Sequence, residues 1–357
     1  MLHLTLYLSG LLLHIYILTK LVLHATIYLL PSSLPQYLSS NPNAAESWAL
    51  ITGSTAGIGF GFAQELLSRG FNVIIHGKDT QELEHARTQL RLSFPHRSIR
   101  IFQYDAAASS TTTLEDSLAK VLQGISLRVL INNVGGQAGQ TRYTYQRLAD
   151  FSDKEVSRVM NVNAHFMTQI NRIILPRFLS TQNKKEREEG GLLPCLILNI
   201  SSLSATGLPY LSVYAASKAY VDAFTRSLHA EMLAEKTPVS VLGVVCGNVQ
   251  SDGHRLTPGW FVPTSRAMAR AALRYVGPAP SSASEPVSGS ASGLASAAAS
   301  ALGRRLGGQR ALVTAYWPHA VQAWGFGILP EKAREWISIS ILRGLKADME
   351  GEERRVR

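Results

Sequence analysis

The sequence is poor in cysteine and comparatively poor in acidic residues. Its two cysteines, Cys195 and Cys246, lie inside apolar runs, which excludes a disulfide scaffold and leaves too few ligands for a Cys/His metal cluster, so no metal is expected. The 25 Asp and Glu are outnumbered by 35 Lys and Arg, and the net charge of +10 suits anionic membranes, phosphorylated cofactors or acyl-CoA substrates. Because basic blocks interleaved with base-stacking aromatic residues are missing, we do not expect a nucleic-acid partner.

The first thirty residues contain almost no charge. Residues 1–19 include no Asp, Glu, Lys or Arg, and the apolar run resumes after Lys20 as far as Leu30. About 20 apolar residues in a helix cross a hydrocarbon core of about 30 Å. We therefore predict a membrane anchor, a transmembrane helix, over residues 1–30 in preference to a cleaved signal peptide, followed by a linker rich in Ser, Pro and Asn over residues 31–45.

From residue 46 onward, apolar runs alternate with helical patterns. The runs that resemble buried strands are 47–52, 72–76, 99–104, 127–132, 195–200 and 239–245. Helical patterns occupy 61–69, 81–92, 114–122, 152–179 and 214–235. Continuously apolar strands that alternate with helices predict an α/β fold, a Rossmann-type doubly wound parallel sheet, in a single domain over residues 46–278.

Two segments interrupt this layout. Residues 184–189 form a charged run, which predicts a solvated loop, and residues 279–308 are dominated by Ala, Ser and Gly, which predicts a disordered insert. Aromatic and apolar residues then return at helical spacing, so we predict a C-terminal helical extension over residues 309–347 before a charged tail, 348–357. This extension either packs on the domain or serves as a membrane-surface or substrate-capping element.

A Gly-rich segment stands between the first predicted strand and the helical run that follows. Glycines at these positions allow a tight turn and the close approach of a pyrophosphate, at a helix N-terminus that favours anions. The segment therefore predicts that a dinucleotide cofactor is bound by Thr52, Gly53, Ser54, Thr55, Gly57, Ile58 and Gly59.

Further candidates follow the ends of predicted strands, the edge at which such sheets bind ligands. The second strand ends at His76 and Gly77 instead of at an acidic residue, and Lys78 follows. A lysine there suits a 2′-phosphate, so NADP(H) is favoured over NAD, although a solvated loop lysine is the alternative. Asp105 and Asn132 close the third and fourth strands and are further candidate cofactor ligands.

The catalytic candidates lie around the fifth strand and the helix that follows it. Ser201 and Ser202 close the strand, and Tyr214 and Lys218 are four residues apart in a helical pattern, which puts them on one face. An ammonium beside a phenol favours the phenolate and lowers its pKa, so Tyr214 can exchange a proton near neutral pH. A serine hydroxyl can bind the substrate oxygen as charge develops on it.

Together these motifs resemble the short-chain dehydrogenases/reductases over about residues 46–275. Residues 48–59, 70–77 and 132–135, with the apolar N-terminus, are similar to the microsomal branch of very-long-chain 3-oxoacyl-CoA reductases and 17-beta-hydroxysteroid dehydrogenases. The resemblance implies that Tyr214 is the general acid/base, that Lys218 holds the nicotinamide ribose and that Asn163 holds a water in a proton relay. The family spacing selects Ser201 as the catalytic serine, whereas its strand position selects Ser202, which we favour.

The chain departs from the family pattern after the sixth strand. Cys246-Gly247 replaces a Pro-Gly turn that contacts the nicotinamide amide, and we interpret the thiol as a buried, inert substitute. Val249 and Ser251 are the residues of this turn that we expect to contact the cofactor.

The sequence thus predicts a membrane-bound NADP(H)-dependent oxidoreductase of lipid metabolism. We expect its substrate to be a lipophilic ketone or secondary alcohol, such as a 3-oxoacyl-CoA or a steroid-like ketone. The expected location is the endoplasmic reticulum, with the catalytic domain facing the cytosol, and a homodimer is left open. The alternatives are a catalytically silent Rossmann scaffold and a reductase of a fungal-type secondary-metabolite ketone.

Overall fold

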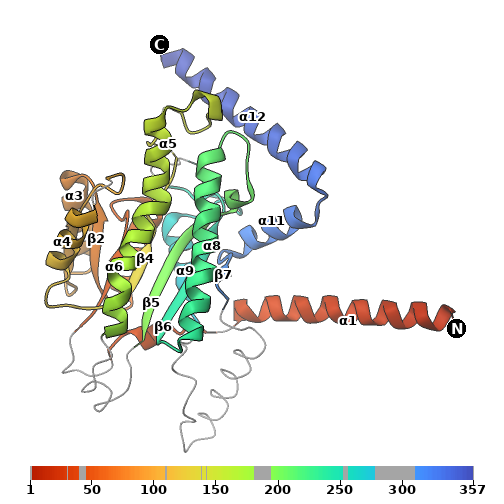
Figure 1. The fold of residues 1–357 in the computed structure, drawn as a ribbon, viewed down its shortest axis with the longest axis horizontal. Helices are drawn as coiled ribbons and strands as arrows, with labels where there is room; N and C mark the ends of the chain where they lie inside the picture. Colours follow the sequence, from red (N-terminus) through yellow and green to blue (C-terminus); the bar gives the residue numbers. More distant parts are fainter. Residues whose placement is uncertain are drawn as a thin grey trace, which may run out of the picture.

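The computed structural model describes residues 2–29, 31–39, 46–108, 111–137, 139–141, 143–180, 194–251, 256–277 and 310–356. The predicted loop over 184–189 and the predicted insert over 279–308 lie outside these residues. Within them, a sheet runs through the middle of the molecule, and α1 (Leu2–Leu29) extends away from it (Figure 1).

The sheet has seven parallel strands in the order β3-β2-β1-β4-β5-β6-β7. Their bounds are β1 Ser47–Ile51, β2 Asn72–Gly77, β3 Ile99–Gln103, β4 Ser126–Asn132, β5 Cys195–Ser202, β6 Val239–Cys246 and β7 Leu312–Val313. The chain builds outward from β1 to β3 and then returns to β4 on the other side of β1. This reversal is the switch point at which doubly wound sheets bind ligands, and it confirms the predicted Rossmann-type fold.

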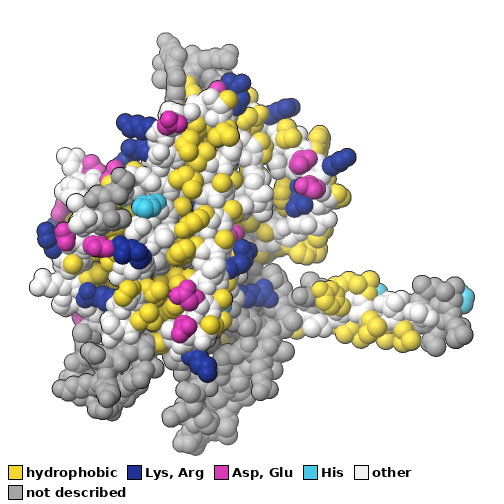
Figure 2. Space-filling model, viewed as in Figure 1, with side chains coloured by type: hydrophobic (Ala, Val, Ile, Leu, Met, Phe, Trp, Pro, Cys, Tyr) yellow, Lys and Arg dark blue, Asp and Glu magenta, His cyan; other side chains and the backbone are white. Residues whose placement is uncertain are grey.

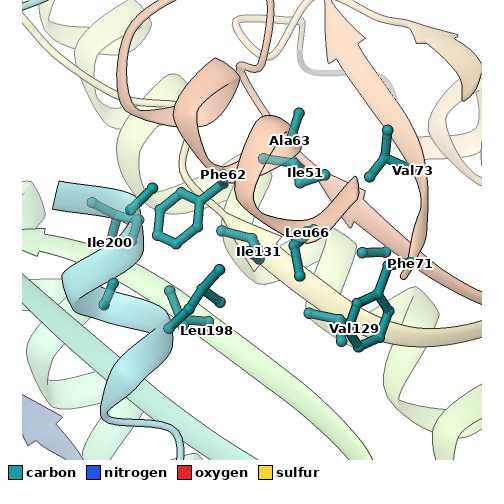
Figure 3. Close-up of a cluster of buried hydrophobic side chains, with 14 of the residues drawn as sticks. Ile51, Phe62, Ala63, Leu66, Phe71, Val73, Val129, Ile131, Leu198 and Ile200 are labelled. Atoms are coloured by element: carbon teal, nitrogen blue, oxygen red, sulfur yellow. The ribbon is translucent and has the colours of Figure 1, made fainter. Parts of the chain in front are cut away.

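Helices cover both faces of the sheet, which explains why the strands are continuously apolar. One face packs against α2 (Gly57–Ser68), α3 (Thr80–Ser93) and α9 (Ser265–Arg274), and the other packs against α4 (Thr111–Val121), α6 (Phe166–Ser180) and α8 (Ser212–Ala234). Figure 3 shows the first layer, in which Phe62 and Leu66 of α2 meet Ile131 and Leu198 of the sheet. The buried apolar face of α2 fixes the start of this helix against the sheet.

The predicted helix over 152–179 is divided into three segments. α5 (Asp153–Met160) begins at a Ser152 capping box, a single π-helical turn occupies Asn161–His165, and α6 follows. The π turn places Asn163 in the interior. Such bulges occur frequently at functional sites.

Residues 31–39, in the predicted linker, pack against the domain. The Ser33 amide donates to the Val276 carbonyl at 2.8 Å, and the Tyr37 hydroxyl donates to Ser240 Oγ at 2.8 Å. Tyr37 and Leu34 are buried. This segment therefore contributes to the core of the domain. Among the helices within the described residues, none combines the length and hydropathy needed to cross a bilayer, so the predicted transmembrane helix is not supported.

The C-terminal extension returns to the sheet edge. β7 pairs with β6, α11 (Trp317–Ile328) follows it, and α12 (Glu331–Val356) continues through most of the predicted charged tail. In Figure 1, α11 and α12 lie beyond the β7 edge, on the side opposite α3 and α4.

Candidate active site

The Gly-rich turn joins β1 to α2 at the C-terminal edge of the sheet. Gly53 and Gly57 have φ values of +61° and +57°, which favour glycine, and a Cβ on Gly59 would lie 2.1 Å from the Gly53 carbonyl oxygen. The N-cap of α2 is Ala56, which has no side-chain acceptor for the first amides of the helix. The turn is therefore compact, and it leads into a helix start of the kind that binds phosphate groups.

Thr52 holds the turn against the end of β4. Its hydroxyl accepts hydrogen bonds from the Asn133 and Val134 amides at 2.9 and 3.0 Å. The Asn133 side chain in turn donates to the carbonyls of Thr52 and Gly53, at 3.0 and 2.9 Å. Thr52 thus positions the turn, and Asn133 is a site residue that the sequence analysis did not select.

Ser54 and His76 fix the turn from the side of β2. The buried Ser54 hydroxyl donates to the Ile51 carbonyl at 2.8 Å and accepts from the His76 amide at 2.9 Å. The His76 ring accepts from the Gly53 amide through Nδ1 at 3.0 Å, and burial lowers the pKa of His76 to about 3. A neutral His76 is therefore part of the turn, a role that sequence spacing alone did not reveal.

Four further cofactor candidates lie near the Gly-rich turn or after β2 and β3, and most of them are at least partly exposed. Lys78 is exposed directly after β2, and the partly exposed Thr55 donates to Glu82 Oε2 at 3.4 Å. Asp105 is exposed after β3, where its carboxylate accepts from the Ala107 amide at 2.9 Å. Ile58 packs against the core from the first turn of α2.

Asn132 belongs to the sheet interior. Its side chain donates to Asn199 Oδ1 at 2.8 Å, and Asn199 donates to Thr225 Oγ1 at 2.9 Å. All three side chains are buried between β4, β5 and α8. The side-chain amide of Asn132 therefore links β4, β5 and α8 beneath the site, and its role as a cofactor ligand stays a prediction.

Tyr214 faces the end of β5. Its hydroxyl hydrogen-bonds to Ser202 and Ser204, and Ser204 Oγ donates to Ser202 Oγ at 2.9 Å. Burial raises the pKa of Tyr214, and the two serines oppose that shift. Desolvation of the phenol outweighs the two serine hydrogen bonds, so the pKa of Tyr214 is shifted upward and not downward as the Tyr214–Lys218 spacing predicted.

The two candidate serines point to different sides of the strand. Ser202 contacts Tyr214, whereas Ser201 is buried and donates to the Lys218 carbonyl at 3.4 Å. Ser201 also hydrogen-bonds to Asp222, a carboxylate whose pKa is raised by burial. The geometry favours Ser202 as the serine of the site. The i+4 spacing from Lys218 is the sequence signal that could have identified Asp222.

Lys218 is buried beneath Tyr214. Its Nζ donates to the Ile200 carbonyl at 2.9 Å and lies 5.8 Å from the centroid of the Tyr214 ring. Burial lowers the pKa of Lys218 to about 8. A Cβ on Gly135 would lie 2.9 Å from Nζ, so glycine at 135 makes room for the ammonium.

Asn163 uses its side chain to close the β4 loop onto the π turn. Its Oδ1 accepts from the Gly136 amide at 2.8 Å, and its Nδ2 donates to the Gly136 and Val159 carbonyls, both at 2.9 Å. These contacts place Oδ1 beside Gly135, where a Cβ would lie 2.7 Å from Oδ1 and 2.9 Å from Lys218 Nζ.

The segment after β6 completes the site. The Cys246 thiol is buried close enough to Tyr214 and Lys218 to influence both pKa values, and burial raises its own pKa to about 12. The thiol is thus buried, as interpreted from the sequence, and burial favours its protonated form. Val249 is buried, and a Cβ on Gly57 would lie 3.2 Å from the Ser251 Cβ, which brings this segment against the Gly-rich turn.

Comparison with known proteins gives consistent matches. The family model described as short chain dehydrogenase matches residues 47–257. A very-long-chain 3-oxoacyl-CoA reductase of Anas platyrhynchos is 31% identical over 235 residues, which cover 65% of this chain and 69% of that protein. A 17-beta-hydroxysteroid dehydrogenase type 3 of Danio rerio is 26% identical over 230 residues, with 64% and 69% covered.

The fold also matches solved structures. A short-chain dehydrogenase from Sphingobium yanoikuyae, solved in complex with NADPH, aligns with a TM-score of 0.51 at 22% identity. The alignment covers 64% of this chain and 83% of that one. At this identity, the match supports the arrangement of the sheet and helices.

Proposed function

Because this chain belongs to the short-chain dehydrogenase family, in the branch that contains very-long-chain 3-oxoacyl-CoA reductases and 17-beta-hydroxysteroid dehydrogenases, we propose that it is an NADP(H)-dependent reductase of lipophilic ketones. Membership makes it an NAD(P)-dependent oxidoreductase that acts on CH–OH groups. The observation that carries the proposal is the convergence of Tyr214, Ser202 and Lys218 at the sheet edge that also holds the Gly-rich turn.

The residues around the Gly-rich turn fit a dinucleotide. Positive φ at Gly53 and Gly57 and the uncapped start of α2 provide backbone amides for a pyrophosphate. Lys78 is proposed to pair with the 2′-phosphate, Lys218 to hold the nicotinamide ribose, and Val249 and Ser251 to contact the nicotinamide end. When bound, the nicotinamide cofactor exchanges a hydride with the substrate carbon.

Residues of the chain itself are proposed to transfer the proton and to bind the substrate oxygen. Tyr214 donates its phenolic proton to that oxygen during reduction, and Ser202 both orients the phenol and donates a hydrogen bond to the developing oxyanion. Lys218 contributes positive charge beneath the ring and favours the phenolate left after proton transfer. Asn163 keeps the adjoining loop in place through Gly136.

The proposed substrate class is tested directly by turnover. Purified protein is incubated with NADPH and a panel of 3-oxoacyl-CoA esters of increasing chain length and steroid ketones, and NADPH absorbance is followed. We expect oxidation with at least one lipophilic ketone, and none with a Tyr214→Phe control. Tight NADPH binding without turnover across the panel would instead support the scaffold alternative.

Cofactor preference provides a separate test at Lys78. We expect the wild type to bind NADPH more tightly than NADH, and Lys78→Glu to weaken NADPH binding by about tenfold or more, because a carboxylate would replace the ammonium beside the 2′-phosphate. Fluorescence titration with both cofactors measures this change. Lys120→Glu, an exposed lysine on α4, is the matched control and should leave the preference unchanged. Equal wild-type affinities for the two cofactors would remove Lys78 from the site.

We also propose that α1 attaches the enzyme to a membrane, the endoplasmic reticulum being expected from the resemblance. Several of its large apolar side chains are exposed, among them Tyr7, Leu12, Tyr16 and Leu18 at 60% or more. Hydrophobic side chains cover much of the visible surface of this helix where it projects from the domain (Figure 2). Exposed apolar surface of this kind marks an interaction with lipid or protein.

Two truncations separate attachment from folding. A chain that starts at Pro31 should be released from membranes yet keep the thermal stability of the full chain, because residues 31–39 still pack on α9 and β6. A chain that starts at Ala45 should lose several degrees in Tm, because it lacks the buried Leu34 and Tyr37. Carbonate extraction and thermal unfolding provide the two measurements. Membrane binding by the chain that starts at Pro31 would contradict attachment through α1.

A further inference from the structure

His319 connects the C-terminal extension to the turn after β6. It lies in the first turn of α11, and its side chain is fully buried. Its Nδ1 is 3.1 Å from the Gly247 amide, and its Nε2 is 3.1 Å from the carbonyl oxygens of both Asn248 and Phe261. One imidazole therefore contacts two consecutive residues of the turn and a third residue in the loop over 259–262.

The partners determine the protonation state of the ring. The Gly247 amide can only donate, so Nδ1 must carry a lone pair, whereas the two carbonyls can only accept, so Nε2 must carry the proton. His319 is thus the neutral Nε2–H tautomer. Burial lowers the pKa of His319, which is consistent with a neutral ring.

Steric contacts show how closely the ring fits the turn. A Cβ on Gly247 would lie 2.8 to 3.0 Å from three atoms of the His319 ring. The absence of a side chain at Gly247 is thus what allows the imidazole to approach the backbone. The loop over 259–262 has a second tie to the same helix start, because the Tyr316 hydroxyl donates to the Trp260 carbonyl at 3.1 Å.

The turn needs such support because residue 246 is Cys, whose φ is not restricted by a ring as that of proline would be. The same turn adjoins Tyr214 and Lys218 through Cys246 and the Gly-rich turn through Ser251. We propose that His319 is a positioning residue that holds the turn over 246–251 in the shape required for nicotinamide binding and ties it to the loop over 259–262. The proposal rests on the proposed function, since that function assigns the turn to the cofactor.

Two near-isosteric substitutions test the acceptor role of Nδ1 and the donor role of Nε2 separately. In His319→Asn, Oδ1 occupies the place of Nδ1 and still accepts from Gly247, but the donor to Asn248 and Phe261 is lost. In His319→Gln, the terminal amide can still donate to those carbonyls, but the acceptor for Gly247 is lost. His319→Leu removes both functions.

We expect His319→Gln and His319→Leu to raise the Kd for NADPH about fivefold or more, with kcat at saturating NADPH within about twofold of the wild type. His319→Asn should retain near-normal NADPH affinity, because Gly247 keeps its acceptor. The matched control is His229→Leu, a buried histidine of α8 that contacts the Val241 carbonyl at 2.9 Å, away from the turn. It should lower Tm without changing the Kd for NADPH.

A cofactor-free measurement distinguishes this inference from the proposed function. Amide hydrogen exchange of peptides covering residues 244–249 should accelerate in the Gln and Leu variants and stay close to wild type in His319→Asn. Unchanged exchange in His319→Leu would overturn the positioning role, whatever the activity. Faster exchange in a protein that binds no nicotinamide cofactor would uphold the positioning of the turn and refute the proposed function.

Discussion

Replacing Tyr214 by Phe is expected to reduce kcat by about 100-fold or more while NADPH binding stays within about twofold of the wild type. The substitution removes only the hydroxyl that Ser202 and Ser204 hold, so the proton donor is lost and the ring remains. Steady-state kinetics with the preferred ketone and fluorescence titration with NADPH provide the two numbers.

Tyr220→Phe is the matched control for this prediction. Tyr220 lies on the same helix, and its hydroxyl pairs with Thr168 at 2.8 Å on the surface. Its loss should leave kcat unchanged. If Tyr214→Phe retained a tenth or more of the wild-type rate, another group would have to supply the proton, and the assignment of Tyr214 would be wrong.

Lys218→Met is expected to impair both cofactor binding and turnover. We expect the Kd for NADPH to rise about tenfold and kcat to fall about 100-fold, because the substitution removes the proposed ribose contact and the positive charge beneath the phenol. The side chain length is nearly preserved, so packing around Gly135 and Ile200 is retained. The same titration and kinetics measure both effects.

Lys154→Met, at an exposed position on α5, controls for the loss of one positive charge. Wild-type NADPH affinity in Lys218→Met together with a low kcat would restrict the lysine to the proton step. Wild-type values for both quantities would remove Lys218 from the site.

The central strands could be predicted from the sequence because they are buried on both faces and form predominantly apolar runs. β7 could not, because Leu312 and Val313 are too short a run to carry a pattern and pair with β6 only through a tertiary contact. The interruption of the helix over 152–179 was missed for a similar reason. The Asn163 side chain accepts a hydrogen bond from the main chain of Gly136, and this long-range contact leaves no trace in the helical periodicity of the sequence.

The same distinction between local patterns and long-range contacts applies to the residues of the site. The Gly-rich turn and the Tyr214–Lys218 pair are local patterns, and both could be located before the structure. The roles of His76 and His319 depend on main-chain atoms 23 and 72 residues away, respectively, so spacing offers no signal for them. The choice between Ser201 and Ser202 depends on which side of β5 faces Tyr214, and the strand extends through both residues.

The packing of residues 31–39 has a mechanical consequence. Ser32 bonds a carbonyl in the last turn of α9, Ser33 and Gln36 bond carbonyls directly after this helix, and Tyr37 bonds Ser240 at the start of β6. A force applied to α1 is therefore resisted by α9 and β6 before it reaches β1, whose C-terminal end carries the Gly-rich turn. Residues 31–39 therefore couple α1 to α9 and to the start of β6, at the end of the strands opposite the one that carries the Gly-rich turn.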